Sequence, residues 1–166
     1  VRAAIQNARY EFPARRITVN LAPADLPKES GRFDLPIALA ILAASGQIPA
    51  DKFKRTEFAG ELALTGELRP VRGALAMALA TRSAGRLLVL PAASAGEAAL
   101  ASGVETLGAT SLLEVCAWLA GQGSLLEPES EPTPAAPDYP DFADVKGQAA
   151  TKRALEVAAA GNHSVL

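Results

Sequence analysis

The sequence has one cysteine, Cys116, and one histidine, His163, among its 166 residues. A single cysteine excludes an intrachain disulfide, and one Cys with one His cannot form a structural zinc site of the usual N/S type. A Ser/His/Asp triad would have to use His163, which follows a proline-rich stretch, so we do not expect this chemistry. Cys116 lies in an apolar helical pattern, where a cysteine is usually a small core residue. The expected compartment is a reducing cytoplasm.

Long apolar runs are also missing. No stretch approaches 18 consecutive apolar residues and no charged-then-apolar leader is present, so we expect neither a membrane-spanning helix nor a signal peptide. The chain begins at Val1 in a helical pattern, without a methionine, and ends in what looks like the start of a strand. We therefore expect a fragment of a longer protein, with one ordinary domain and additional material.

Basic residues are absent from residues 87–145, which hold nine acidic residues. Residues 1–86 hold 13 basic and 8 acidic side chains, and residues 146–166 have a small basic excess. A basic first half is compatible with binding to nucleic acid or to another acidic surface. The favoured interpretation is ordinary solvated surface, because no Lys/Arg cluster with interleaved aromatic residues occurs.

The order of strand and helix patterns predicts an α/β fold, or an α+β fold with a mixed sheet. Alternation or short apolar runs predict strands at 17–21, 87–90, 104–107 and 164–166. Helical spacing predicts helices at 1–10, 34–45, 73–83, 92–101, 110–121 and 148–160. Asp34 is a candidate N-cap for the second helix. That helix is apolar nearly all round and should therefore be buried on more than one face. Residues 22–33 are predicted to be loop.

The stretch Gly60–Pro70 (GELALTGELRP) predicts a half-buried β-hairpin. Its leucines alternate with Glu and Thr, and the turn is expected at Thr65–Gly66. Gly60, Gly66 and Gly73 fit a strand kink, a turn and a helix start. No G-x-x-x-x-G-K-[ST] motif occurs in the sequence, so this chain by itself does not form the usual phosphate-binding loop.

Residues 122–140 contain five prolines, four acidic residues and no basic residue. Such a segment cannot bury enough apolar surface to offset the entropy lost on ordering. It is predicted to be a linker that separates residues 1–121 from residues 141–166.

Several blocks carry a family resemblance. They are PADLPKESGRFDLPIALAILAASGQI (Pro23–Ile48), FAGELALTGELRPVRGALAMALA (Phe58–Ala80), LPAASAGEAAL (Leu90–Leu100) and DFADVKGQAATKRALEVAAAGNHSVL (Asp141–Leu166). These blocks closely resemble the magnesium-chelatase-like AAA+ ATPases of the YifB/ComM type, in the family's order. The resemblance covers nearly all of residues 1–121 and 141–166. It implies that residues 1–121 are a Lon-protease-like domain of the ribosomal-protein-derived βαβ type, without its first strands. It also implies that residues 141–166 are the start of a P-loop AAA+ domain, cut before the Walker A loop.

The resemblance also locates where Lon-type peptidases carry their Ser–Lys pair. The position of the nucleophile falls on Arg32 or Phe33, depending on where one residue is gapped, and the position of the Lys falls near Leu75. An activated serine needs a base within hydrogen-bond reach. Ser30 is near the nucleophile position but misplaced, and loop hydrogen bonding is its expected role. We therefore expect no peptidase activity and assign no catalytic residue.

For the full-length parent, the resemblance implies an ATP-dependent motor that uses ATP and magnesium as a homo-hexamer. In the ComM branch it implies a DNA helicase that promotes branch migration in natural transformation, with DNA as partner. The alternative is a protein-interaction or hexamer-organising domain of a chelatase-type ATPase with no DNA contact. Val145, Gly147 and Gln148 match the segment that flanks the adenine in AAA+ proteins. We expect no cofactor, metal or membrane partner for the fragment itself.

Overall fold

A parallel sheet of three strands, in the order β1–β4–β5, lies at the centre of the first part of the chain. The computed structural model describes residues 1–22, 31–128 and 141–165. The strands are β1 (Thr56–Phe58), β4 (Leu87–Pro91) and β5 (Thr106–Ala109). Phe58 pairs with Val89, and Val89 pairs with Leu107. The expected α/β class is confirmed, but the predicted mixed sheet is wrong for the described residues, because the antiparallel hairpin forms a separate sheet beside this parallel one.

Helices connect and cover these strands. The α-helices are α1 (Arg2–Asn7), α2 (Asp34–Ala44), α3 (Ala74–Ser83), α4 (Ala92–Ala99), α5 (Leu112–Leu119) and α6 (Ala149–Gly161). Short 3-10 helices are η1 (Gly31–Phe33), η2 (Asp51–Arg55) and η3 (Phe142–Asp144). The chain divides into two compact units, Val1–Glu131 and Pro132–Leu166, and each is described by itself.

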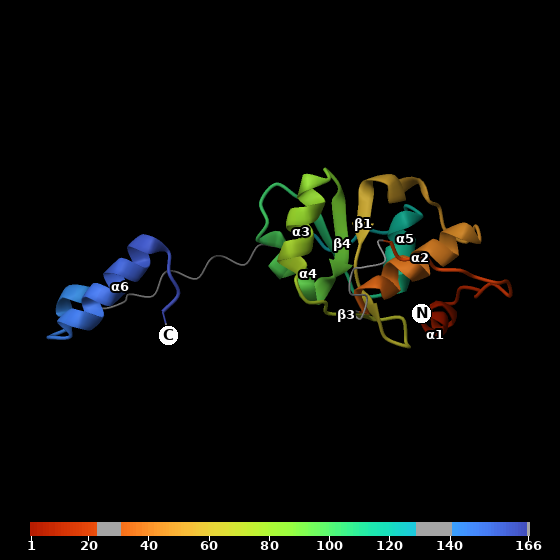
Figure 1. Ribbon diagram of the computed structural model, residues 1–166. Coiled ribbons are helices and arrows are strands. Elements are labelled where there is room, and N and C mark those ends of the chain that lie inside the picture. The colour runs from red at the N-terminus through yellow and green to blue at the C-terminus, as the bar shows by residue number, and fades with distance from the viewer. Residues whose placement is uncertain (23–30, 129–140, 166) are drawn as a thin grey trace. The chain divides into compact units, whose positions relative to one another are not determined.

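Strand β4 separates two apolar layers because successive side chains of a strand point to opposite faces. Val89 belongs to the larger cluster, which includes the inner sides of α1, α2 and α5. Leu88 and Leu90 belong to the smaller cluster, formed with alanines of α3 and α4. Figure 1 shows α3 and α4 on one side of β1 and β4, and α2 and α5 on the other. This two-sided burial accounts for the continuous apolar run of β4.

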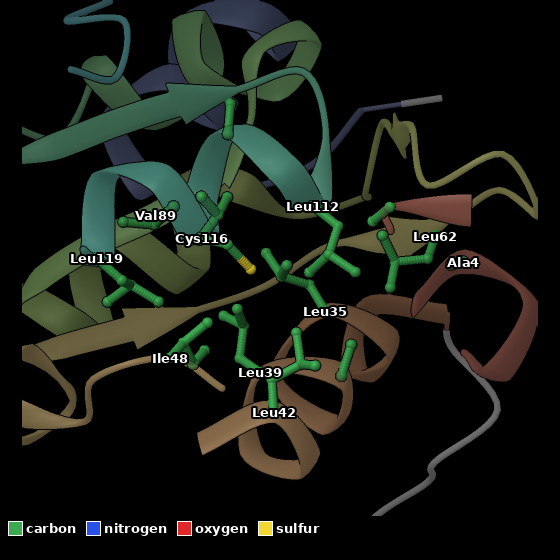
Figure 2. Packing of buried hydrophobic residues seen from close by; sticks show 14 of the residues in the cluster. Ala4, Leu35, Leu39, Leu42, Ile48, Leu62, Val89, Leu112, Cys116 and Leu119 are labelled. Atoms are coloured by element: carbon green, nitrogen blue, oxygen red, sulfur yellow. The ribbon is translucent and has the colours of Figure 1, made fainter. Parts of the chain in front are cut away.

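Leucine is the most frequent residue in the larger cluster. In Figure 2, Leu35, Leu39 and Leu42 of α2 point toward Cys116 and Leu112 of α5. The Cys116 side chain is fully buried among them, as expected for a small core residue.

The hairpin prediction is confirmed. Strands β2 (Glu61–Leu62) and β3 (Leu68–Arg69) pair antiparallel, with Leu62 opposite Leu68. Gly66 has φ +92° in the turn, a backbone conformation that favours glycine. The backbone N–H of Leu68 donates to the Thr110 carbonyl at 2.8 Å, so the hairpin is joined to the segment before α5.

Two predicted strands are wrong as far as the structure describes them. Residues 17–21 belong to none of the strands that the structure describes in residues 1–22, 31–128 and 141–165. Ser164 and Val165 are likewise not in a strand, and Leu166 lies outside the described residues. In the predicted loop 22–33, residues 23–30 lie outside the described part, while Gly31–Phe33 form a 3-10 helix.

The start of the predicted linker packs on the first unit. Leu125 is 7% exposed and belongs to the larger apolar cluster. Leu126 and Gly108 exchange two backbone hydrogen bonds, at 2.7 and 3.0 Å, which adds a bridge to β5. Residues 129–140, the rest of the predicted linker, lie outside the described residues.

Candidate functional site

The start of α2 and the start of the hairpin meet through the backbone. The N–H of Gly60 donates to the Arg32 carbonyl, and the N–H of Leu35 donates to the Gly60 carbonyl, both at 2.9 Å. These bonds hold Arg32 and Phe33, the candidates that the family resemblance gives for the nucleophile position, beside the hairpin.

Asp34 does not cap α2 as expected. Phe33 occupies the N-cap position and makes no side-chain cap, while Asp34 is the first residue of the helix. The Asp34 carboxylate instead accepts a hydrogen bond from the backbone N–H of Leu62 at 3.3 Å. The helix start therefore has a tertiary partner, the hairpin, in place of a local cap.

Glu61 adds a second close approach at this junction. Its side chain lies so close to Gly31 that a Cβ built on Gly31 would come within 2.6 Å of Glu61 Cγ. Arg69, opposite Glu61 in the hairpin, has its Nη1 3.8 Å from Glu61 Oε1. Sequence reasoning did not single out Glu61 or Arg69 as site residues. The alternation of charged and apolar residues in the hairpin is the signal that could have paired them.

The residues that the resemblance gives for the two positions of the peptidase pair lie on separate elements. The guanidinium of Arg32 lies 5.6 Å from the centre of the Phe33 ring. Leu75 is in the first turn of α3, half-buried against the smaller apolar cluster, and its N–H donates to Glu97 Oε1 at 3.1 Å. Helices α2 and α3 cover opposite faces of the sheet (Figure 1). None of these three side chains is a serine nucleophile or a lysine base. Ser30 lies outside the described residues.

The second unit brings Val145, Gly147 and Gln148 together at the start of α6. Gly147 and Gln148 both have positive φ, +72° and +58°, which turns the chain into the helix. Lys152 Nζ donates to the Val145 carbonyl, and Thr151 Oγ1 donates to Gln148 Oε1 at 3.2 Å. All three residues are exposed. They form an ordered helix start that presents one apolar side chain, Val145.

Two features are not found among the described residues. Across residues 1–22, 31–128 and 141–165 there is no group of three or more His, Cys, Asp or Glu side chains placed to hold a metal ion. Within the same ranges, no helix combines the length and apolar character needed to cross a bilayer.

The sequence matches known protein families. Residues 1–94, more than half of the chain, match the family described as subunit ChlI of Mg-chelatase. The chain belongs to the ChlI family of magnesium chelatase. Residues 141–166 match a second description, magnesium chelatase, subunit ChlI. Both units therefore carry ChlI sequence.

Individual relatives place the chain in the YifB/ComM type of this family. Competence protein ComM of Haemophilus influenzae is 48% identical over 171 residues, covering all of this chain and 34% of that protein. YifB of Escherichia coli is 48% identical over 166 residues, covering all of this chain and 33% of that protein. An uncharacterized Mycobacterium tuberculosis protein is 38% identical over 171 residues, again with 33% of its length covered. The chain spans about a third of the length of the curated relatives it matches.

Proposed function

We propose that this chain is the non-catalytic N-terminal part of a magnesium-chelatase-related AAA+ ATPase whose full-length form is an ATP-dependent DNA motor. The observation that carries the proposal is the junction between α2 and the hairpin, where Arg32 and Phe33 lie beside Gly60. By the family resemblance, Arg32 or Phe33 occupies the position of a peptidase nucleophile and Leu75 that of the base, and none of the three can serve as either. The similarity of the whole chain to a competence protein supports the DNA-linked part of the proposal.

The fold proposed for the first unit is the Lon-protease-like βαβ type. The parallel pairing of β1 with β4 and the hairpin between them support it. We place the end of this domain after residue 128, because Leu125 packs into its core. A linker then leads to the start of a P-loop AAA+ domain at residues 141–166.

Loss of peptidase activity is tested with casein as substrate. We expect no cleavage by the purified chain, because an activated serine needs a base within hydrogen-bond reach and Arg32, Phe33 and Leu75 supply neither group. Cleavage that disappears in the Ser30→Ala variant would contradict this part of the proposal. A Ser83→Ala variant is the matched control, since the Ser83 hydroxyl bonds only to the carbonyl of Leu79 in its own helix.

The full-length protein is proposed to bind ATP with magnesium, with Val145, Gly147 and Gln148 beside the adenine. A fluorescent ATP analogue titrated onto the 166-residue chain should show no measurable affinity, because the sequence holds no Walker A motif. The same analogue should bind the full-length protein, and Val145→Asp should weaken that binding. Micromolar affinity for the 166-residue chain would place the nucleotide site elsewhere.

DNA contact by the first unit is tested by gel shift on single-stranded and forked DNA. If basic side chains contact phosphates, binding should weaken steeply as salt rises. Absence of binding even at low salt would contradict DNA contact by this part of the chain.

The full-length protein is also proposed to work as a cytoplasmic homo-hexamer. The alternative role, a hexamer-organising domain with no DNA contact, is tested by removing residues 1–128 from the full-length protein and measuring both its oligomeric state and its DNA affinity. If the hexamer is lost while DNA affinity is unchanged, this unit organises the hexamer.

A further inference from the structure

Basic side chains from two separate segments gather at the end of the sheet where its parallel strands begin. Helix η2 carries Lys52, Lys54 and Arg55 and leads directly into β1. The first residue of β1 is paired with the first residue of β4. Arg55 and Arg86, the residues that precede this pair, are therefore neighbours although they are far apart in the sequence. Helix α3 runs beside β4 and brings Arg82, in its last turn, to the same end of the sheet (Figure 1).

Three of these five cations have a partner within the fold. Lys52 Nζ donates to the Trp118 carbonyl at 2.6 Å and lies 4.1 Å from the centre of the Trp118 ring. Arg82 Nη1 donates to a backbone carbonyl after α4 at 3.0 Å. Arg86 Nη1 lies 3.3 Å from Glu57 Oε1. These contacts give the three side chains a structural role.

The other two cations, Lys54 and Arg55, have no such role in the described part of the chain. Both are exposed, and neither makes a hydrogen bond or an ion pair with another residue of the ranges 1–22, 31–128 and 141–165. They are consecutive in the sequence, so their two charges lie close together at the surface. Their positive charge is therefore available to a partner from outside the fold.

Acidic residues do not balance this charge. Within residues 51–57 and 82–87, five basic residues accompany two acidic ones, Asp51 and Glu57. Glu105 and Glu127 lie beside β5, which β4 separates from β1. The β1 and β4 part of this end of the sheet therefore has an excess of positive charge, which attracts an acidic partner.

The surface chemistry favours a phosphate backbone over an acidic protein. The large apolar side chains that are exposed in the described residues include none from residues 50–57 or 82–87. The core of a protein interface, in contrast, is apolar and depleted in lysine. Contacts to DNA phosphates need only lysine and arginine side chains, and the release of counterions from the DNA supplies much of their affinity.

We propose that Lys54 and Arg55 bind phosphates of a DNA backbone. This inference rests on the DNA-linked function proposed above, and it names the surface by which the first unit contacts the nucleic acid. Arg82 and Arg86 keep their partners in the fold and add to the positive potential around the site. Phosphate contacts position a protein on DNA without reading its bases, so binding here is independent of base sequence.

The test is the salt dependence of DNA binding by the 166-residue chain, measured by fluorescence anisotropy on labelled single-stranded and duplex DNA. Loss of one phosphate contact lowers the slope of log K against log salt concentration by about 0.7 on single strands and about 0.9 on duplex DNA. Lys54→Gln and Arg55→Gln should each lower the slope by this amount, and to the same extent on DNA of unrelated sequence. Lys54→Arg retains the charge and should keep the slope of the unmodified chain.

Arg72→Gln is the matched control. Arg72 is exposed and precedes α3, at the opposite end of that helix from Arg82, and its substitution removes the same charge. This variant should leave the slope unchanged. An equal decrease in Arg72→Gln, Lys54→Gln and Arg55→Gln would overturn the assignment to this surface.

The remaining outcomes separate this inference from the proposed function. If the unmodified chain binds DNA but Lys54→Gln and Arg55→Gln keep its slope, the inference is wrong, while DNA contact by the first unit stands. If the unmodified chain does not bind DNA even at low salt, both are wrong. If the two substitutions disrupt assembly of the full-length protein and leave the slope unchanged, the surface contacts protein, which would also overturn the inference.

Discussion

The Arg32 carbonyl accepts a hydrogen bond from the backbone N–H of Gly60 at 2.9 Å, which fixes the start of α2 against the start of the hairpin. The same glycine accepts a bond from the N–H of Leu35 through its carbonyl. With both backbone groups engaged, Gly60 has little freedom to move. A Cβ at this position would lie 3.2 Å from Leu35 Cβ and 2.9 Å from Leu68 Cδ2. The close approach of hairpin and helix therefore depends on the absence of a side chain at residue 60.

Gly60→Ala should lower the free energy of unfolding by roughly 1–3 kcal/mol, the range for overpacking a filled core. The Leu68 side chain can move, but Leu35 Cβ is fixed to a buried helix, so part of the crowding persists. Urea unfolding followed by the fluorescence of Trp118 measures the change in the first unit.

Gly96→Ala is the control for this substitution. Gly96 is inside α4 and has no heavy atom within 4 Å of the Cβ that alanine would add. Because alanine is the better helix former, this variant should be more stable by about 0.5–1 kcal/mol. If Gly60→Ala were as stable as the unmodified chain, the proposed crowding at Leu35 would be wrong.

The parts of the fold that sequence predicts well are those specified by local patterns. The apolar run before Pro91 gives β4, and the leucine alternation around Gly66 gives the hairpin. The strand predicted at residues 17–21 has an equally clear pattern but belongs to none of the described sheets, because strand formation depends on a pairing context that a local pattern does not specify.

Nonlocal contacts also account for what sequence reasoning missed at the site. Asp34 has the residue type and position of an N-cap, but its carboxylate bonds to the N–H of Leu62 in the hairpin. Leu125 lies in a composition typical of a linker, but one leucine can be buried where a core surface passes nearby. Composition averages over a segment, whereas burial is decided residue by residue. The contact between Glu61 and Gly31 depends in the same way on the meeting of two distant segments.

Leu125→Ala should destabilise the first unit by roughly 2–5 kcal/mol, as expected when a buried leucine is truncated in a packed cluster. Leu126→Ala is the matched control, because Leu126 is 56% exposed and its backbone bonds to Gly108 do not need its side chain. It should change the free energy of unfolding by less than about 0.5 kcal/mol. Urea unfolding of both variants gives the comparison. Equal, small effects would show that residues 122–128 contribute nothing to the core.

Ser111→Ala should cost about 1 kcal/mol, because Ser111 is the N-cap of α5. Its hydroxyl accepts a hydrogen bond from the N–H of Glu114 at 3.3 Å. The Glu114 carboxylate in turn accepts a hydrogen bond from the N–H of Thr110 at 2.7 Å. Two hydrogen bonds therefore connect residues 110 and 111 with Glu114 across the first turn of α5. Thermal unfolding measures the loss, and Ser83→Ala is the control. The Ser83 hydroxyl only bonds back to the carbonyl of Leu79, so its removal should be neutral or slightly stabilising. An equal loss in both variants would argue against the cap.

The stability of the first unit should fall in alkaline solution because of Cys116. Burial raises the pKa of its thiol to about 11 from an ordinary value of 9.0, although a hydrogen bond with Tyr10 acts in the opposite direction. The folded protein therefore holds the thiol proton more tightly than the unfolded chain does. The stabilisation is fully present below pH 9 and is lost as the pH rises through 11, a decrease of roughly 3 kcal/mol at most.

The measurement is the urea midpoint of the unmodified chain and of Cys116→Ala across pH 8 to 11. Cys116→Ala should be less stable at pH 8, because the thiol fills core volume, and should lose less stability as the pH rises. Tyr10→Phe controls for the neighbouring phenol. Burial raises the pKa of Tyr10 to about 12, with Cys116 contributing in the same direction, so its own loss falls at higher pH, from about 10 to 12. Parallel pH profiles for the unmodified chain and Cys116→Ala would show that the buried thiol does not set the alkaline limit of the fold.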